Sequence, residues 1–442
     1  MEDEEYGLYR YRWVVLGAFM FVIVITQIMW LNYAAITSTT GTGANKLIGV
    51  AQLMNVSEFK ITQLANINNL LFLPFAIPAG IIVDRKGFRY AVMIGAVLTA
   101  GFSFLRLFSG NYWLVFIGMA GIAVGGPFVL IAITKMVAAW FPTEESALAT
   151  GLAALAMFLG MIIALALTPV LLKVFGDTLS GVRWMVLVYS LLAAVSVVLF
   201  WLFAKAKPPK PPKRTEQELQ EEGAAINWAS FGKIFKLYDF KLLCIVMFIG
   251  FGAVTAILQL IDQILKPKHI SSTTSGLVGA VFVMAGVVGC VVIPALSDKY
   301  RRRKPFIVLS AGMAVPAMFL MAQLSGTTQT FLVSMFMGFF LVAAYPVVLT
   351  LNEETTGHGL TGTASAILML LGNLGGWTLT LAMEGIKGLT GGANNSFYWS
   401  IIFLVVLFVI AFVAALFIRE DNARFGNAGD GDAGDESAVP AH

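Results

Sequence analysis

A cluster of polar and aromatic residues lies within the first apolar stretch of the chain, in the segment TQIMWLNYAAIT (26–37). Amide and hydroxyl groups form hydrogen bonds, and aromatic rings hold organic cations through cation–π contacts. Asn32 points nearly the opposite way from the other polar side chains. The other polar and aromatic side chains lie on one stripe at helical spacing, formed by Thr26, Gln27, Trp30, Tyr33 and Thr37. Because polar groups are costly in apolar surroundings, we expect this stripe to line a pathway or a ligand site.

The same spacing test selects polar side chains in later apolar stretches. Thr255, Gln259 and Asp262 recur on one face, as do Asn373, Trp377 and Thr380. Asn66 and Asn69 share a face earlier in the chain, where hydrogen bonding between helices explains the pair as readily as a ligand does. The candidate ligand-binding residues are Gln27, Trp30, Tyr33, Asn69, Gln259, Asp262, Tyr345, Asn373 and Trp377.

The charged residues in the apolar stretches favour an amine as ligand. Asp262, together with nearby aromatic rings, can hold an organic cation. Arg106 and Lys135 are the alternative, because either can hold a carboxylate. Arg106 can instead extend outward to the boundary, and Lys135 lies just before the boundary segment WFP. We expect Glu384 to pair with a lysine of a loop.

The elements that position these residues are membrane-spanning helices. The chain is 58% hydrophobic and 12% charged over 442 residues, unlike a soluble domain. About twelve stretches are long enough to cross roughly 30 Å of hydrocarbon. The first is too long for a signal peptide, so it is predicted to be retained. The stretches are 13–38, 62–83, 90–108, 112–138, 146–172, 182–204, 241–265, 272–296, 305–324, 328–351, 361–385 and 396–418.

A polar linker divides these stretches into two sets of six. The segment AKAKPPKPPKRTEQELQEEG is rich in proline and charge, and the tail GNAGDGDAGDESAVPAH is rich in Gly and Asp. The predicted organisation is an N-terminal six-helix bundle (1–204), a cytoplasmic linker (205–240), a C-terminal six-helix bundle (241–420) and a disordered cytoplasmic tail (421–442).

The distribution of basic residues predicts the orientation. Roughly 20 of the 29 Lys and Arg lie at the N-terminus, in the even-numbered loops and at the C-terminus, which makes that side cytoplasmic. We therefore expect an integral multi-pass membrane protein with both termini inside, in the plasma membrane.

A charged motif closes the second and the eighth stretches. GIIVDRKGFR (80–89) places Asp84 before a basic cluster, and IPALSDKYRRRK (293–304) does the same with Asp298. Glycine lets another helix approach closely, and a boundary Asp can accept hydrogen bonds from a helix N-terminus. We expect basic residues, Arg303 among them, to pair with Glu145 and Glu354 in gating. The predicted gating set is Gly80, Asp84, Arg85, Gly87, Arg89, Glu145, Asp298, Arg301 and Glu354.

The pattern G-x-x-x-D-R-x-G-x-R in the first copy resembles the signature between helices two and three of the major facilitator superfamily. The resemblance implies two six-helix bundles around a central cavity, which rock to give alternating access. Pro294 stands where the second copy would carry glycine. The fourth stretch, FIGMAGIAVGGPFVLIAIT, lacks the Arg that completes a charge relay in many relatives, so Asp84 must use other partners.

Longer segments are similar to the feline leukaemia virus subgroup C receptor branch of that superfamily. They are IMWLNY, AAWFPTEES, LQLIDQIL, VMAGVVGCVVIPALSD and AYPVVLTLNEETTG. The resemblance implies transport of choline or ethanolamine. Members have also been linked to haem export, but no His or Cys stands in a pathway position here. Members typically carry Gln in helices five and eleven at the substrate site, where this sequence has Phe158 and Asn373.

The leading hypothesis is a secondary transporter that moves a small polar organic solute by alternating access, with an amine such as choline as one candidate. A monocarboxylate or amino-acid transporter of the same fold is the alternative. A membrane receptor or sensor without transport is the alternative from another class, but the short tails offer no signalling domain.

Other functions find little support in the sequence. It contains no Ser/His/Asp set, metal-ligand cluster or phosphate-binding loop, so we predict neither an enzyme nor a cofactor or metal site. The net charge of +4 is spread over loops, which argues against nucleic acid. The predicted partners are a small-molecule substrate and the lipid bilayer, for a monomer. A coupling ion, either a proton or sodium, is also considered: Asp262 is the candidate titrating group for a proton, and uniport without a coupling ion is at least as favoured.

Overall fold

The protein is a bundle of long helices, as the apolar stretches predict. The computed structural model describes residues 9–40, 47–209, 232–356, 360–390 and 396–420. Within these ranges, twelve helical stretches are long and apolar enough to cross a membrane, which confirms the predicted all-α membrane fold. Helices suit this environment because they satisfy backbone N–H and C=O groups within one segment. The predicted disordered tail and linker residues 210–231 lie outside the described ranges.

The first half of the chain supplies six of these stretches, of which three consist of two elements each. The first passes from α1 into the 3-10 turn η2, the third passes from α4 into the 3-10 turn η4, and the fourth is divided into α5 and α6. The elements are α1 (Arg12–Leu31), η2 (Ala34–Ile36), α2 (Val50–Leu53), α3 (Glu58–Lys86), α4 (Phe88–Ser103), η4 (Phe104–Leu107), α5 (Tyr112–Leu130), α6 (Ala132–Trp140), α7 (Thr143–Phe175) and α8 (Leu179–Phe203).

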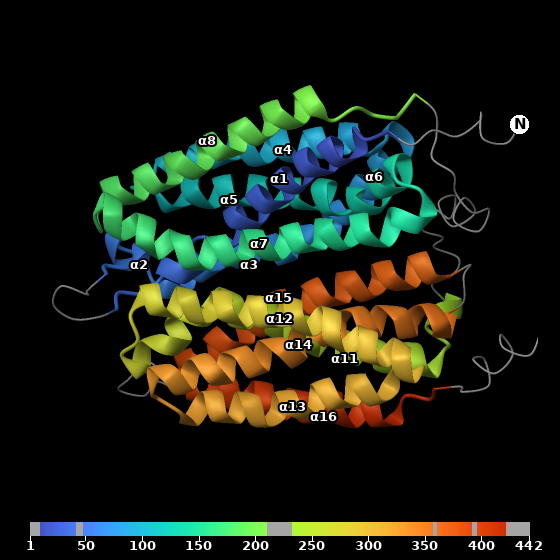
Figure 1. The fold of residues 1–442 in the computed structure, drawn as a ribbon. Coiled ribbons are helices and arrows are strands. Elements are labelled where there is room, and N and C mark those ends of the chain that lie inside the picture. The colour runs from blue at the N-terminus through green and yellow to red at the C-terminus, as the bar shows by residue number, and fades with distance from the viewer. Residues whose placement is uncertain (1–8, 41–46, 210–231, 357–359, 391–395, 421–442) are drawn as a thin grey trace, which may run out of the picture.

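The second half supplies the other six. Its elements are α11 (Tyr238–Leu265), η5 (Lys266–Lys268), α12 (Ser272–Tyr300), α13 (Lys304–Gln323), α14 (Thr327–Thr356), α15 (Thr361–Thr390) and α16 (Tyr398–Phe417). Figure 1 shows the halves as two layers, with α1 to α8 in one and α11 to α16 in the other. We call the end where α1 and α11 begin the linker end, and the end where they finish the far end.

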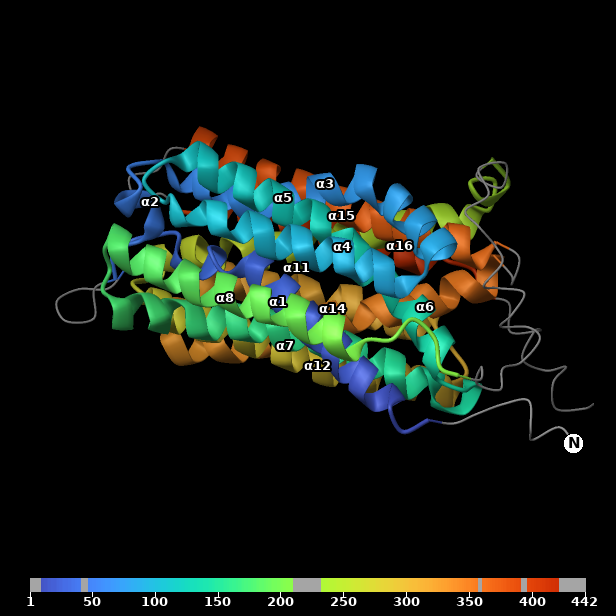
Figure 2. The same cartoon turned by 90° about the horizontal axis from the view of Figure 1, so that it is seen from above.

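The two halves pack against each other near the far end. Trp30, Leu31 and Leu165 of the first half belong to the same buried core as residues of α11, α12 and α14. On one side α7 packs on α12, where an added Cβ at Gly276 would collide with the carbonyl of Leu165. On the other side α3 lies beside α15, as Figure 2 shows from above. The contact therefore runs through the far halves of these helices.

Two glycines of the predicted gating motif have different roles. Gly87 joins α3 to α4 with φ of +82°, a conformation that L side chains rarely adopt, so the turn requires glycine. The close helix approach expected at Gly80 is not seen, because an added Cβ there would meet no described atom within 4 Å. Close approaches occur instead at Gly95 with Gly125 and at Gly252 with Gly375.

Candidate functional site

A cluster of polar side chains lies where α3 meets α11 and α15. Thr380 donates a hydrogen bond to Gln259 Oε1 at 3.3 Å, which links α15 to α11. Gly376 lacks a side chain where Thr255 Oγ1 and Asn69 Nδ2 approach, and an added Cβ would lie 2.7 Å from Asn69 Nδ2. These residues therefore bring three helices from both halves together at one place.

Amide groups in this cluster have unused hydrogen-bonding capacity. Asn69 Nδ2 and Gln259 Nε2 have no partner among the described residues, although both side chains are 1% exposed or less. A buried polar group left unpaired costs about 1–3 kcal/mol. Asn66 precedes Asn69 by three positions on α3. Its Oδ1 also has no partner among the described residues, while its Nδ2 donates to the carbonyl of Trp377 at 3.3 Å. The cluster can therefore satisfy a ligand that offers hydrogen-bond acceptors.

Helix α1 contributes an aromatic wall to the same interface. Trp30 is 7% exposed, and its indole N–H donates to the carbonyl of Ala65 in α3 at 3.1 Å. This bond leaves the ring itself as an apolar surface. Gln27 packs next to Gly160 of α7: a Cβ added at Gly160 would lie 2.7 Å from the Cβ of Gln27. The Oε1 of Gln27 has no partner among the described residues.

Tyr33 lies away from Trp30 and Gln27, inside the first half. Its ring lies against the guanidinium of Arg106, 4.7 Å from centroid to Cζ, and the side chain is 0% exposed. Asn32 and Tyr33 keep right-handed helical dihedral angles, so the helical spacing still holds at Tyr33. What distinguishes Tyr33 from Trp30 is its contact with the guanidinium of Arg106 in η4.

Asp262 forms a bond between the two halves. The side chain is 0% exposed, and its Oδ2 accepts a hydrogen bond from the backbone N–H of Ser38 at 2.7 Å. Next to it, the hydroxyls of Thr40 and Ser272 lie 2.6 Å apart, and the backbone N–H of Ser272 donates to Thr40 Oγ1 at 2.5 Å. We call these four residues, Ser38, Thr40, Asp262 and Ser272, the far-end seal.

Beside the far-end seal, a network of charged residues also crosses between the halves. Glu58 of α3 pairs with Lys266 at 2.6 Å and with Lys387 at 3.1 Å. Thr62 donates to Glu384 Oε1 at 2.9 Å and accepts from Gln263 Nε2 at 2.6 Å. Sequence reasoning missed this network, because Glu58 and both lysines look like ordinary boundary charges.

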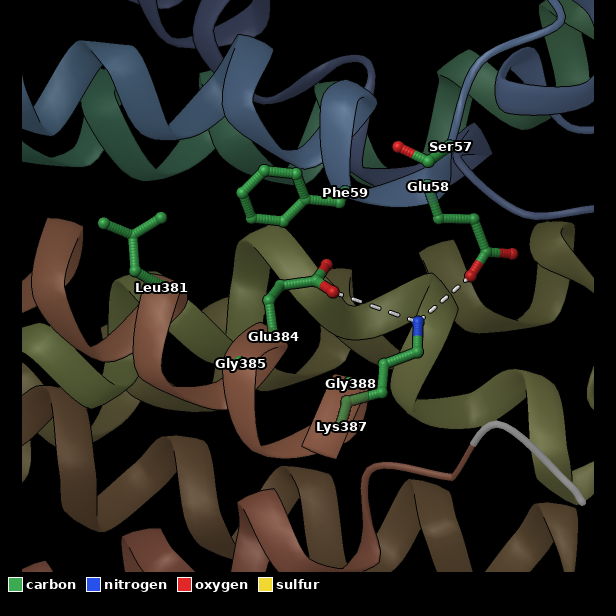
Figure 3. Close-up of a pocket in the computed structure, with 8 residues that line it drawn as sticks. All are labelled: Ser57, Glu58, Phe59, Leu381, Glu384, Gly385, Lys387 and Gly388. Carbon is green, nitrogen blue, oxygen red and sulfur yellow. Dashed lines mark hydrogen bonds and ion pairs between the residues drawn. The ribbon is translucent and has the colours of Figure 1, made fainter. Parts of the chain in front are cut away.

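The expected partner of Glu384 is close but lies on the same helix. Lys387 Nζ is 4.0 Å from Glu384 Oε2 and 3.0 Å from Gln263 Oε1. Figure 3 shows Lys387 between the two carboxylates, at a groove of about 620 Å³. The groove is lined by Ser57, Glu58, Phe59, Leu381, Glu384, Gly385, Lys387 and Gly388.

The remaining predicted ligand residues lie in the second half. Tyr345 of α14 packs beside Phe251 of α11, with ring centroids 5.8 Å apart. Asn373 donates to the carbonyl of Met369 in its own helix at 2.9 Å and is 7% exposed. In the first half, Phe158 of α7 packs against the core that includes Trp30. Phe158 is the position at which the resemblance implies a substrate-site Gln. Its ring supplies apolar surface in place of an amide.

At the linker end, the ion pairs of the described residues each join residues of the same half. Arg12 holds Glu145 through two bonds of 2.7 and 2.9 Å, and Lys135 lies 3.8 Å from Asp84. Asp84 thus has a lysine partner from α6, the second part of the fourth span. Arg89 donates to the carbonyl of Trp201 at 3.0 Å.

The second copy of the motif is organised by Arg303, which pairs with Glu354 at 2.9 Å and also with Asp298. Burial alone would lower the pKa of Arg303, but the hydrogen bonds and charges of Glu354 and Asp298 raise it above its usual value. Arg301 ends α12 with φ of +51°. Arg85 is exposed at the end of α3.

Comparisons with known proteins agree with this architecture. A model of the Major Facilitator Superfamily matches residues 14–379. The choline/ethanolamine transporter flvcr2a of Danio rerio is 24% identical over 98% of this chain and 92% of that protein. The human choline/ethanolamine transporter FLVCR2 is 23% identical over 94% and 78%. Solute carrier family 49 member A3 of Danio rerio is 25% identical over 93% and 88%.

Solved structures show the same fold. A bacterial homolog of the human lysosomal transporter Spinster, in an inward-facing and unoccupied conformation, matches with a TM-score of 0.71 at 18% identity. The match covers 93% of this chain and 98% of that one. The Escherichia coli fucose:proton symporter FucP matches with a TM-score of 0.61 at 15% identity, over 93% and 100%.

Proposed function

Because the chain belongs to the Major Facilitator Superfamily, we propose that it is a secondary transporter that moves a small polar organic solute by alternating access. The substrate that we favour is an amine such as choline. The site is the cluster between the halves, in which Trp30, Asn69, Thr255, Gln259 and Trp377 surround the solute.

The asymmetry of the two ends carries this proposal. At the far end, Ser38 with Asp262 and Glu58 with Lys266 bond one half to the other. At the linker end, the ion pairs of the described ranges stay within one half, as for Arg12 with Glu145. A transporter that is closed on one side has this pattern, and rocking of the halves would exchange it. With the linker end cytoplasmic, as the basic residues predict, the conformation is inward-facing.

Two observations support an amino alcohol as substrate. The relatives flvcr2a and FLVCR2 are choline/ethanolamine transporters, at 24% and 23% identity. Within this chain, the Trp30 ring offers an apolar face to a quaternary ammonium group, and the free amide N–H groups of Asn69 and Gln259 suit a hydroxyl oxygen.

A carboxylate solute is the second candidate, and the same two amide groups favour it. Asn69 Nδ2 and Gln259 Nε2 are both donors, and a carboxylate accepts at both oxygens. Asp262 Oδ2 is bonded to Ser38 and Oδ1 has no partner among the described residues, but the side chain is 0% exposed, so a cation would reach it only after the far-end seal opens. Coupling to a proton or to sodium, the plasma membrane and the monomeric state remain predictions of the sequence.

The test is counterflow of labelled choline into liposomes that contain the purified protein. Transport should fall at least tenfold in Gln259→Leu and in Trp30→Ala, since each removes a contact worth about 1.4 kcal/mol or more. Gln329→Leu is the matched control, because this glutamine is exposed at the start of α14. Uptake of a monocarboxylate and not of choline would overturn the choline assignment and favour a carboxylate as substrate. Binding without flux would favour a receptor and reject the transporter.

A further inference from the structure

Arg106 is buried inside the first half, where its charge has no acidic partner. It lies in η4 at the far end of the third span, and its side chain is 0% exposed. The outward extension allowed by the sequence therefore does not occur. None of the ion pairs between described residues includes Arg106. Removing a charge from water costs several kcal/mol unless a counter-ion and hydrogen bonds compensate it.

The hydrogen bonds of Arg106 are incomplete. A guanidinium has five N–H donors. Nη1 bonds Met29 Sδ at 3.1 Å and Nη2 bonds Asn32 Oδ1 at 3.0 Å, which leaves the other three N–H groups without an acceptor among the described residues. Nε is entirely unpaired. The face of the Tyr33 ring attracts the cation, but it offers no acceptor to these N–H groups.

The two residues that contact the guanidinium add further unused donors. Asn32 Nδ2 and the Tyr33 hydroxyl have no partner among the described residues, and both side chains are 0% exposed. The Asn32 amide cannot turn to hide its donor, because its oxygen is already bonded to Arg106. A buried positive charge is thus accompanied by three kinds of unused donor: guanidinium, amide and phenol.

We propose that Arg106, Asn32 and Tyr33 bind a small inorganic anion, with chloride as the fitting ion. An anion supplies the missing negative charge and accepts several N–H and O–H bonds at once. A monatomic ion suits this site because the Arg106, Asn32 and Tyr33 side chains are all 0% exposed. The arginine stem is fixed by Gly118, where an added Cβ would lie 2.9 Å from Arg106 Cγ.

The proposed anion site is connected to the far-end seal by a short piece of chain. Asn32 and Tyr33 directly precede η2, and Ser38 follows it. Ser38 then donates its backbone N–H to Asp262 of the other half. An anion that fixes Asn32 and Tyr33 therefore fixes the segment that presents Ser38. Chloride should favour the conformation in which the far end is closed.

The experiment measures thermal unfolding of the purified full-length protein while chloride replaces gluconate at constant sodium and ionic strength. A ligand of the folded state raises the melting temperature in a saturable way. We expect such a rise in the wild type and in Arg183→Gln, a control arginine that is exposed at the start of α8. Arg106→Gln should lose it. A wild type without chloride dependence, or an unchanged response in Arg106→Gln, would overturn the anion site.

A second pair of measurements decides the case if Arg106→Gln does not fold. Tyr33→Phe keeps the ring against Arg106 and removes only the hydroxyl, so its chloride response should need several-fold more chloride. A bromide derivative should show an anomalous peak beside the Arg106 guanidinium. A normal chloride response in Tyr33→Phe together with no bromide at this place would reject the proposal. Neither measurement depends on transport, so the result is independent of the proposed substrate.

Discussion

The carboxylate of Asp262 and the backbone N–H of Ser38 are 2.7 Å apart, although 224 positions separate the two residues in the chain. Ser38 belongs to the first half and Asp262 to the second. Both are 0% exposed, so the bond forms in surroundings from which water is excluded. Leaving the buried Ser38 N–H without an acceptor would cost about 1–3 kcal/mol, which makes this bond a main element of the closed far end.

Asp262→Asn should weaken closure of the far end, because the neutral amide makes a weaker bond with the Ser38 N–H. A loss of about 1.5 kcal/mol shifts the conformational equilibrium roughly tenfold. Spin labels at Lys173 and Gln329, in a background without native cysteines, should report longer distances across the far end. Asp177→Asn is the control, since Asp177 bonds the N–H of Ile48 within the first half. Equal distance distributions in both variants would contradict this role.

Glu58→Gln should weaken closure of the far end and make that closure less sensitive to salt, because Glu58 pairs with both Lys266 and Lys387. We expect a coupling energy of about 1 kcal/mol in a double-mutant cycle with Lys387→Met, measured from the closed fraction at low salt. High salt should reduce the coupling by screening the exposed part of the network. Glu144→Gln is the control, since this residue is exposed at the linker end. A coupling energy of zero at low salt would show that the network does not contribute to closure of the far end.

Gly376→Ala should reduce solute binding while the protein stays folded. The added methyl would occupy the space where Thr255 and Asn69 meet, and would lie 2.7 Å from Asn69 Nδ2. We expect choline affinity to fall at least tenfold, about 1.4 kcal/mol, by calorimetry or scintillation proximity. Gly385→Ala, on the same helix, has no described atom within 4 Å of the added carbon and should bind normally. Equal affinity in the two variants would place the solute elsewhere.

Gly87→Ala should destabilise the fold, and Gly80→Ala should not. Gly87 has φ of +82° and ψ of 164°, a region that only glycine adopts readily, so alanine there costs about 1–3 kcal/mol. Gly80 lies within α3 with free space around it, where alanine gains about 0.5–1 kcal/mol of helix stability. If the turn alone requires glycine, thermal unfolding in the same detergent should show a lower melting temperature for Gly87→Ala and a higher one for Gly80→Ala than for the wild type. A loss at position 80 would indicate a close helix contact in another conformation.

The sequence predicts the twelve spans because membrane insertion depends mainly on the apolarity of each segment by itself. It selects Gln259, Asn373 and Asn69 as ligand candidates for a similar reason, since polar residues in lipid need partners. Contacts between distant segments are harder to predict. The bonds of Glu58 to two lysines require knowledge of which helix ends meet, and periodicity within one helix does not contain it.

Tyr33 and Arg106 show a second limit. Helical spacing groups Tyr33 with Trp30, and positions 32 and 33 keep helical dihedral angles, yet the Tyr33 ring packs against the Arg106 guanidinium. Arg106 looks able to extend to the boundary, yet Gly118 lets its stem pack inward. Both outcomes depend on local packing that the apolar pattern does not record.

The far-end seal has a consequence for how the sequence can vary. Its donor at position 38 is a main-chain N–H, which every amino acid except proline carries. The identity of that side chain is therefore free to drift as long as it stays small enough for a site with no exposed surface. The acceptor at position 262 is a side chain and has no such freedom. In a saturation library, position 38 should reject proline and bulk, while position 262 should reject nearly everything but aspartate.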